Sequence, residues 1–133
     1  MIRFLSLMVM TLAVSPAWAN GDDPLAEYLW TARPLVIFAD SPNDPRYLQQ
    51  IAAIDARRAD LAERDVIVLT DTEPAGSALR TVLRPRDFMI VLIGKDGQVK
   101  LRKPFPWDVR ELSRAIDKMP LRQQEMRAPV VAE

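Results

Sequence analysis

The stretch Leu35-Val36-Ile37-Phe38-Ala39 and the segment Asp40-Ser41-Pro42-Asn43-Asp44-Pro45 that follows it decide the fold. The first is a continuous apolar run of strand length, which is typical of a strand covered on both faces of a sheet. The second combines turn-forming residues with a helix start, because aspartate is a favoured N-cap and proline fits the first helical position. Together they predict a buried strand, a turn and a helix.

The helix after this turn is predicted from Tyr47, Ile51, Ile54 and Leu61, which recur at helical spacing and form one apolar face. We expect it to cover one face of the sheet. The other expected elements are a helical turn at 25–30, a second buried strand at 66–69, a short helix capped by Ser77, a third apolar strand at 88–93 and a closing helix at 107–119.

A hairpin is predicted at Gly94-Lys95-Asp96-Gly97, since an Asp-Gly pair supplies the left-handed backbone angles of a tight turn. The following residues 98–102 alternate between polar and apolar side chains. This alternation predicts a half-exposed edge strand antiparallel to the third strand. It also predicts that Lys100 and Arg102 share one face of that strand.

Parallel strands joined by helical crossovers and closed by an antiparallel hairpin make a mixed sheet with helices on both sides. The sequence therefore predicts an α/β, thioredoxin-like domain built on a mixed four-stranded central sheet with helices on both faces. We expect this domain to span residues 20–126, with a frayed tail at 127–133.

The first nineteen residues have the three parts of an export signal: Arg3, an apolar run at 4–14, and the small-residue cleavage motif Ala17-Trp18-Ala19. The run is roughly half of the about 20 apolar residues that a membrane-spanning helix needs. We therefore predict a signal peptide at 1–19, export to the periplasm or the medium, and no stable membrane anchor after cleavage.

Composition excludes several kinds of chemistry. The chain has no cysteine and no histidine, so it lacks the thiolate of a thiol oxidoreductase and the usual general base of a serine hydrolase. Lys and Arg (18) balance Asp and Glu (18), which is unlike a nucleic-acid-binding domain. A Ser-Lys pair of Ser41 with Lys95 or Lys100 stays open.

Three oxygen-bearing side chains, Asp40, Asn43 and Asp44, lie close together in the first turn. A calcium ion takes six to eight oxygen ligands, so helix capping explains this cluster better than a metal site. No metal and no cofactor are expected.

Three separated motifs resemble the family called domain of unknown function 4174: residues 30–39, residues 88–102, and Ile116-Asp117-Lys118-Met119-Pro120 with Arg122 and Glu125-Met126. The resemblance covers nearly the whole chain after the signal. It implies a thioredoxin- or peroxiredoxin-like fold and a setting in bacterial exported proteins and in animal secreted, matrix and sushi-repeat proteins. It implies no reaction.

Two regions are candidate binding surfaces, and no residue is assigned a catalytic role. The basic residues of the hairpin either protect an edge strand from unwanted pairing or receive an anionic partner. Trp30, Tyr28 and Trp107 are expected to be partly exposed, and packing is favoured over sugar stacking for each. The candidate binding residues are Asp40, Ser41, Asp44, Lys95, Lys100 and Arg102.

The function predicted from the sequence is an exported, non-catalytic binding or scaffolding module whose partner is an envelope protein or an anionic polymer. The alternative is a cysteine-independent enzyme that uses carboxylate, serine or lysine groups near the first-strand loop. An enzyme of this kind requires a concave pocket that holds titratable groups with perturbed pKa values.

Overall fold

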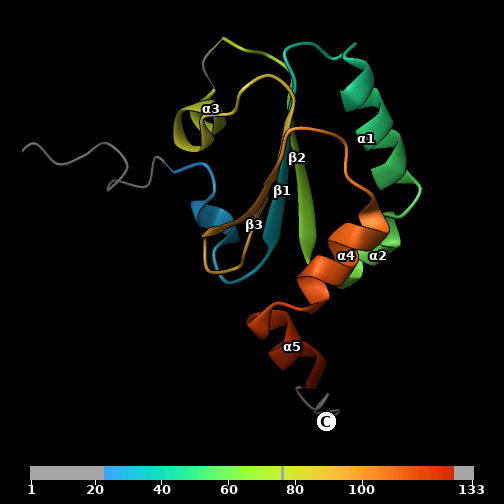
Figure 1. Cartoon of the computed structure of the whole chain (residues 1–133). Coiled ribbons are helices and arrows are strands. Elements are labelled where there is room, and N and C mark those ends of the chain that lie inside the picture. Colours follow the sequence, from blue (N-terminus) through green and yellow to red (C-terminus); the bar gives the residue numbers. More distant parts are fainter. Residues whose placement is uncertain (1–22, 76, 128–133) are drawn as a thin grey trace, which may run out of the picture.

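The computed structural model describes residues 23–75 and 77–127. Its sheet has the strand order β2-β1-β3-β4 (Figure 1). β1 (Arg33–Phe38) pairs parallel with β2 (Val66–Asp71) and antiparallel with β3 (Met89–Ile93), and β3 pairs antiparallel with β4 (Val99–Lys103). The predicted mixed four-stranded sheet is confirmed. The predicted signal peptide lies outside the described residues.

β1 is buried along its whole length, and its side chains alternate between two apolar clusters. Leu35 and Ile37 face α1 (Pro45–Asp55), α2 (Arg58–Glu63) and α4 (Val109–Asp117). Val36 and Phe38 face α3 (Ala78–Leu83) on the other side, where the short 3-10 helix η2 (Ala26–Tyr28) also lies (Figure 1). The predicted helices on both faces are therefore present.

The local helix signals act as expected. The Asp44 carboxylate accepts a hydrogen bond of 2.9 Å from the backbone N–H of Arg46, and Pro45 is the first residue of α1. The Ser77 hydroxyl accepts from the N–H of Arg80 at the start of α3. In the predicted hairpin turn, Gly97 has a φ of +80°, which glycine adopts without strain, but Asp96 does not take the left-handed conformation expected of an Asp-Gly pair.

Two elements differ from the prediction. The helix expected to run from Pro45 past Leu61 is interrupted at Arg57, whose φ of −138° is not helical, so the segment forms α1 and α2. β2 lies at an edge of the sheet and not at its centre, and its outer residues such as Ile67 are partly exposed. The prediction that β2 is buried on both faces is wrong, because sheet position depends on the tertiary arrangement.

The closing helix begins at Val109, two residues later than expected, because Asp108 caps it. Trp107 lies before the helix and is buried, so the expectation that it is partly exposed is wrong. The buried Gln50 amide holds it, accepting from the Trp107 N–H at 2.6 Å and donating to the Trp107 carbonyl at 3.1 Å. These two bonds join α1 to the segment that leads into α4.

A second C-terminal helix, α5 (Pro120–Arg127), lies at the end of the sheet where β1 begins (Figure 1). Arg127 was expected in a frayed tail but is the last residue of this helix, and residues 128–133 lie outside the described residues. Within 23–75 and 77–127, no helix combines the length and apolarity needed to cross a membrane.

The pairing of β3 with β4 contains a register shift. Leu92 pairs with Leu101, but Ile93 pairs with Val99, so Lys100 is an extra residue on β4. A bulge of this kind interrupts the alternation of side chains. Lys100 consequently lies beside Met119 and Pro120 on the α4 side, while Arg102 donates to the Leu83 carbonyl of α3 on the other side. The prediction that Lys100 and Arg102 share a face is wrong.

Candidate functional site

The two candidate regions lie at opposite ends of the sheet. Asp40, Ser41 and Asp44 follow the carboxyl end of β1, whereas Lys95 lies at its beginning, where its carbonyl accepts a 2.7 Å hydrogen bond from the Trp30 N–H. A six-residue strand separates them by about 20 Å. The loop and the hairpin therefore form no common surface, and a Ser41–Lys95 catalytic pair is excluded.

The first-strand loop organises its own backbone. The Ser41 hydroxyl accepts from the Asn43 N–H at 3.1 Å, and Asp44 caps α1 while it pairs with the Arg46 guanidinium at 2.7 Å. The side-chain hydrogen bond from Arg46 is the main cause that holds the pKa of Asp44 below its ordinary value. Asp40 is exposed and lies 3.9 Å from Arg80. Capping and turn formation account for these side chains.

A polar cluster joins α3 to the carboxyl ends of β1 and β2. The Ser77 hydroxyl donates to the buried Asp71 carboxylate, and Arg80 donates to the same carboxylate and to the Ala39 carbonyl at 2.8 Å. Burial acts to raise the pKa of Asp71, but hydrogen bonds from Ser77, the Glu73 N–H and Arg80 outweigh it and lower the pKa. Asp71 thus remains an ionised anchor for α3.

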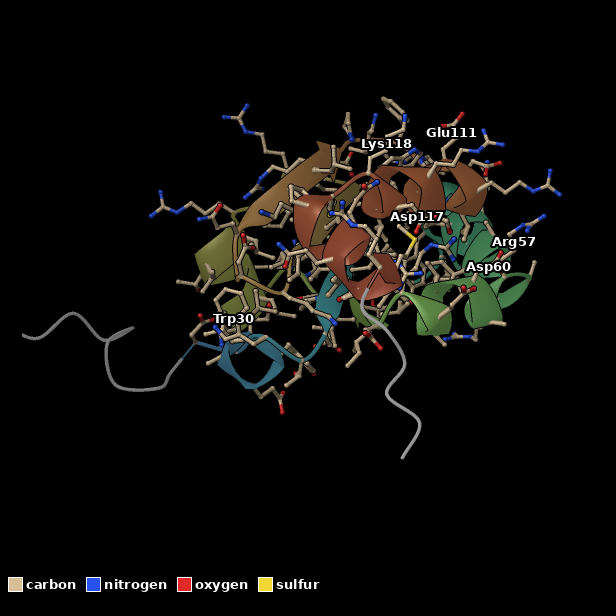
Figure 2. All side chains as sticks on the ribbon, turned by 90° about the horizontal axis from the view of Figure 1, so that it is seen from below. Trp30, Arg57, Asp60, Glu111, Asp117 and Lys118 are labelled. Carbon is tan, nitrogen blue, oxygen red and sulfur yellow. The ribbon has the colours of Figure 1, made fainter. Side chains whose placement is uncertain are left out.

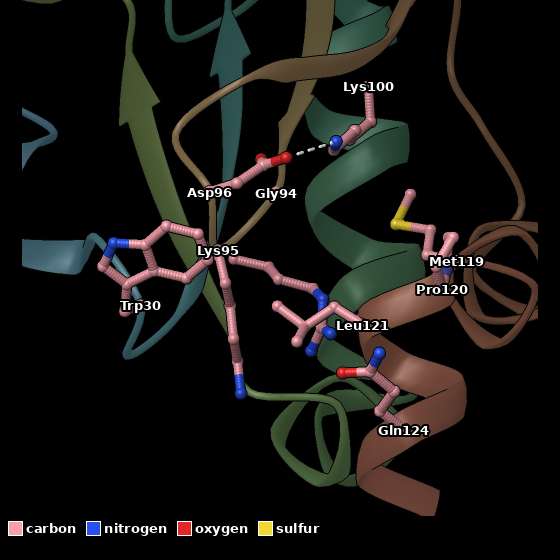
Figure 3. Close-up of a pocket in the computed structure, with 10 residues that line it drawn as sticks. Trp30, Gly94, Lys95, Asp96, Lys100, Met119, Pro120, Leu121 and Gln124 are labelled. Carbon is pink, nitrogen blue, oxygen red and sulfur yellow. Dashed lines mark hydrogen bonds and ion pairs between the residues drawn. The ribbon is translucent and has the colours of Figure 1, made fainter.

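At the other end of the sheet lies a pocket of about 360 Å³, which we call the Trp30 pocket (Figure 3). Trp30 forms one side of it, and Leu121 and Gln124 of α5 form the opposite side. The hairpin contributes Lys95 and Lys100, so two of the predicted binding residues meet here. Arg102 is absent from its lining because the bulge turns it to the other face.

Ion pairs neutralise the cations of the Trp30 pocket. Lys95 Nζ lies 2.8 Å from Asp65 and 2.6 Å from Glu125, and Lys100 Nζ lies 2.7 Å from Asp96. Burial acts to lower the pKa of Lys95, but hydrogen bonds to Asp65 and Glu125 outweigh it and raise the pKa above its ordinary value. Lys95 is held in its charged form, which is the opposite of what a nucleophilic lysine requires.

A second hollow of about 580 Å³ adjoins the Trp30 pocket and shares Lys100, Met119 and Pro120 with it. It lies between β4 and α4, and we call it the basic groove because Lys100, Arg114 and Lys118 line it. Glu111 also lines the groove and accepts a hydrogen bond from the Trp107 indole. The Trp30 pocket and the basic groove are therefore neighbours on the molecule.

The exposed face of α4 carries Arg110 and Arg114, and Lys118, the residue that caps the end of α4, continues the row at the same spacing of four (Figure 2 labels Lys118). Residues at this spacing lie on one side of a helix, and this row spans about 12 Å. Among the described residues, none of the three forms an ion pair, whereas Arg57 and Arg58 of the α1–α2 region pair with Asp60 and Asp55. The row is an uncompensated positive surface.

Charge is divided across the sheet. Residues 84–127, which include β3, β4, α4 and α5, have eleven Lys and Arg against six Asp and Glu, a net charge of +5. Residues 23–83, which include β1, β2, α1, α2 and α3, have six against ten, a net charge of −4. The balanced total conceals this separation, and the basic groove lies in the positive part.

The sequence reasoning overlooked several residues that line these hollows. The spacing of Arg110, Arg114 and Lys118 was visible in the sequence and could have indicated the positive row. No local signal marks Leu121 or Gln124, because the pocket assembles only when α5 packs beside the hairpin.

Comparison with known proteins agrees with this architecture. A reduced 2-Cys peroxiredoxin from Plasmodium vivax aligns with a TM-score of 0.58 and 18% identity over 77% of this chain and 84% of its own. Thioredoxin peroxidase I from Plasmodium yoelii aligns with a TM-score of 0.53 and 20% identity over 82% of this chain and 85% of its own. These similarities establish the thioredoxin-like fold, and this chain has no cysteine.

Sequence comparison identifies the family. Coiled-coil domain-containing protein 80 of Danio rerio is 31% identical over 133 residues, an alignment that covers 77% of this chain and 15% of that protein. The chain thus matches a small part of a much longer relative. The model of the family described as domain of unknown function (DUF4174) matches residues 24–125. The chain belongs to the DUF4174 family.

Proposed function

We propose that this domain is a non-catalytic binding module for an anionic polymer, which it receives in the basic groove and along the exposed face of α4. The row of Arg110, Arg114 and Lys118 carries the proposal. Like charges four residues apart destabilise a helix by about 0.2–0.5 kcal/mol per pair. A polyanion that lies along the row supplies the missing negative charges, so its attraction to the three cations offsets their mutual repulsion.

The neighbouring surface supports this assignment. Lys100 lies across the groove from Arg114 and Lys118 but is paired with Asp96, so the unpaired positive charge of the hollow comes from the α4 side. The net charge of +5 over residues 84–127 attracts an anionic chain from a distance. Of the two partner classes expected from the sequence, the anionic polymer fits this extended surface.

The pKa shifts favour binding over acid-base catalysis. The shifted pKa values of Asp96 and Lys95 in the Trp30 pocket, and of Glu125, which pairs with Lys95, all stabilise the charged form. For Asp96, the side-chain hydrogen bond from Lys100 is the main cause of the lowered pKa. A general acid or base at neutral pH needs the opposite shift.

The test is an affinity measurement with oligogalacturonate and with polyaspartate, two polyanions of different backbone, over a series of salt concentrations. The variant R114Q/K118Q removes two cations of the groove, and R57Q/R58Q removes two cations from ion pairs elsewhere. We expect wild type to bind both polymers and R114Q/K118Q to lose about tenfold in affinity. The slope of log K against log salt should also decrease by about 1 to 2.

Equal losses in R114Q/K118Q and R57Q/R58Q would show that net charge acts without a defined surface. The absence of polyanion binding by the wild-type protein would contradict the proposal outright. A DNA duplex serves as a third polyanion, and binding confined to it would reassign the surface to nucleic acid.

We further propose that the protein is exported, as Arg3, the apolar run at 4–14 and Ala17-Trp18-Ala19 indicate. The envelope or the medium is where an extracellular polyanion would be met. Intact-mass analysis of envelope and culture fractions should find a chain that begins at Asn20. A chain that begins at Met1 in both fractions would contradict cleavage.

A further inference from the structure

The Trp30 pocket presents an aromatic ring that the fold does not bury. Trp30 is 64% exposed, and it stands across the pocket from Leu121 and Gln124 (Figure 3). A tryptophan gains most of its stabilising effect from burial. Here most of the ring stays in contact with solvent beside a pocket of about 360 Å³, where a ligand could cover it.

The backbone of Trp30 is strained to produce this arrangement. Its φ is +63°, in the left-handed region that bulky side chains rarely adopt. The hydrogen bond from its N–H to the Lys95 carbonyl fixes the conformation and directs the residue toward the hairpin. Strain of this kind without compensating burial is characteristic of binding sites.

The charged groups of the pocket are already paired, so the part of a ligand that enters it needs no charge. Arg33 pairs with Glu125, and Lys100 pairs with Asp96. Gly94 makes the second pair possible, because a Cβ at this position would lie 2.5 Å from Lys100 Cε and 2.7 Å from Asp96 Oδ1. The pair folds over the glycine and lines the pocket.

Hydrogen-bonding capacity nevertheless remains at the rim. The Gln124 side-chain amide makes no hydrogen bond to another described residue, and an ammonium group such as that of Lys100 has three donors, of which Asp96 uses one. The pocket therefore combines an aromatic wall and apolar surface from Met119 and Leu121 with hydrogen-bond donors and acceptors at its edge.

We infer that the Trp30 pocket is a subsite for one pyranose ring of an anionic polysaccharide. The C–H face of a pyranose stacks on an indole, and its hydroxyl groups meet Gln124 and the Lys100–Asp96 pair. An apolar peptide side chain would match the ring but would cover the Gln124 amide without giving it a partner. Because the pocket and the basic groove share Lys100, a polymer seated on Trp30 continues directly toward Arg114 and Lys118.

This inference rests on the proposed function and names the polymer as a polysaccharide. The test compares oligogalacturonate, which has both carboxylates and pyranose rings, with polyaspartate, which has carboxylates alone. W30N removes the indole and keeps a residue that tolerates the left-handed conformation. F105A is the matched control, since Phe105 is also exposed but follows β4 at the far end of the sheet.

We expect W30N to reduce the affinity for oligogalacturonate about tenfold and to leave the affinity for polyaspartate unchanged. F105A should bind each of the two polymers with the affinity of the wild-type protein. Q124A should weaken oligogalacturonate binding about threefold, while Q49A on the exposed side of α1 should not. Melting midpoints of the four variants confirm that they are folded.

The outcomes separate the two proposals. If W30N leaves both affinities unchanged, or reduces both equally, the sugar subsite is wrong while the anionic-polymer module stands. If wild type binds polyaspartate but not oligogalacturonate, the polysaccharide is wrong and an acidic protein replaces it. If wild type binds neither polymer, the proposed function fails and the subsite fails with it.

Discussion

The guanidinium of Arg33, the first residue of β1, lies 3.1 Å from both carboxylate oxygens of Glu125 in α5, ninety-two positions later in the chain. Arg33 is only 1% exposed, and its other terminal nitrogen donates to the Arg64 carbonyl at 2.8 Å. Glu125 also receives Lys95. The buried residue of α5 is the charged Arg122, which pairs with Asp117. Ion pairs therefore hold α5 in place more than apolar packing does.

Glu125→Gln should destabilise the protein strongly. The substitution leaves the Arg33 charge buried without its counter-charge. Breaking a fully buried pair in this way lowers the free energy of unfolding by about 3 kcal/mol, and we expect a somewhat smaller loss here because Glu125 is partly exposed. Urea unfolding measures the free energy. The control is Glu63→Gln, which removes a mostly exposed carboxylate near Arg64 and Arg122 and should change little. Equal effects of the two variants would contradict the anchoring role of Glu125.

Stability should fall in acid through the same pairs. The side-chain hydrogen bond from Arg64 chiefly lowers the pKa of Asp117, and bonds from Lys95 and Arg33 lower that of Glu125 against the effect of burial. An acid with a lowered pKa in the folded state binds its proton more readily when unfolded. Its contribution is complete above its ordinary pKa and is lost as the pH falls through the folded value.

Thermal melts from about pH 7 to about pH 2 test this expectation, and the variant D117N/E125Q should have a flatter acid limb than wild type. Lys95 acts in the opposite direction. Its raised pKa gives a contribution that is complete below the ordinary lysine value and lost as the pH rises through the folded value. An acid limb unchanged in the variant would show that other carboxylates govern acid unfolding.

Trp30→Gly should stabilise the domain although it removes a large side chain. Glycine adopts the left-handed backbone without the penalty of about 1–2 kcal/mol that a bulky residue incurs, and the exposed indole contributes little burial. We expect a gain of about 1 kcal/mol and a melting midpoint that is several degrees higher. A lower midpoint would mean that the indole packs more tightly than its exposure indicates.

Arg114→Gln should stabilise α4 and weaken polyanion binding at the same time. It relieves two like-charge contacts, with Arg110 and with Lys118, worth about 0.5 kcal/mol together. Chemical denaturation measures the gain, and the affinity for oligogalacturonate measures the loss. Arg58→Gln, which breaks an ion pair with Asp55, should do neither. A destabilised R114Q would show that Arg114 has a structural partner in solution.

Elements set by local signals could be predicted from the sequence. Asp44 and Pro45 start α1, Ser77 starts α3, and Gly97 closes the β3–β4 hairpin, each for a reason contained within a few residues. The continuous apolar run at 35–39 correctly predicted that β1 is buried on both faces, because every residue of the run is apolar.

Features that depend on distant contacts could not be predicted. The bulge at Lys100 is a property of pairing with β3, and simple alternation put Lys100 and Arg102 on the same face. The Trp30 pocket requires three segments, of which α5 is positioned by the Arg33–Glu125 pair. Charge balance over the whole chain likewise gave no indication that its two halves have opposite signs.

The Arg33–Glu125 pair also affects how such a domain can be used within a longer protein. It joins the first strand to the last described helix, so residues near both limits of the family match at 24–125 are held to each other. A unit closed on itself in this way holds its C-terminal helix without help from a neighbouring domain, which favours its use within longer chains. The alignment with the zebrafish protein covers most of this chain but only 15% of that much longer protein, as expected for a domain that is used within longer chains.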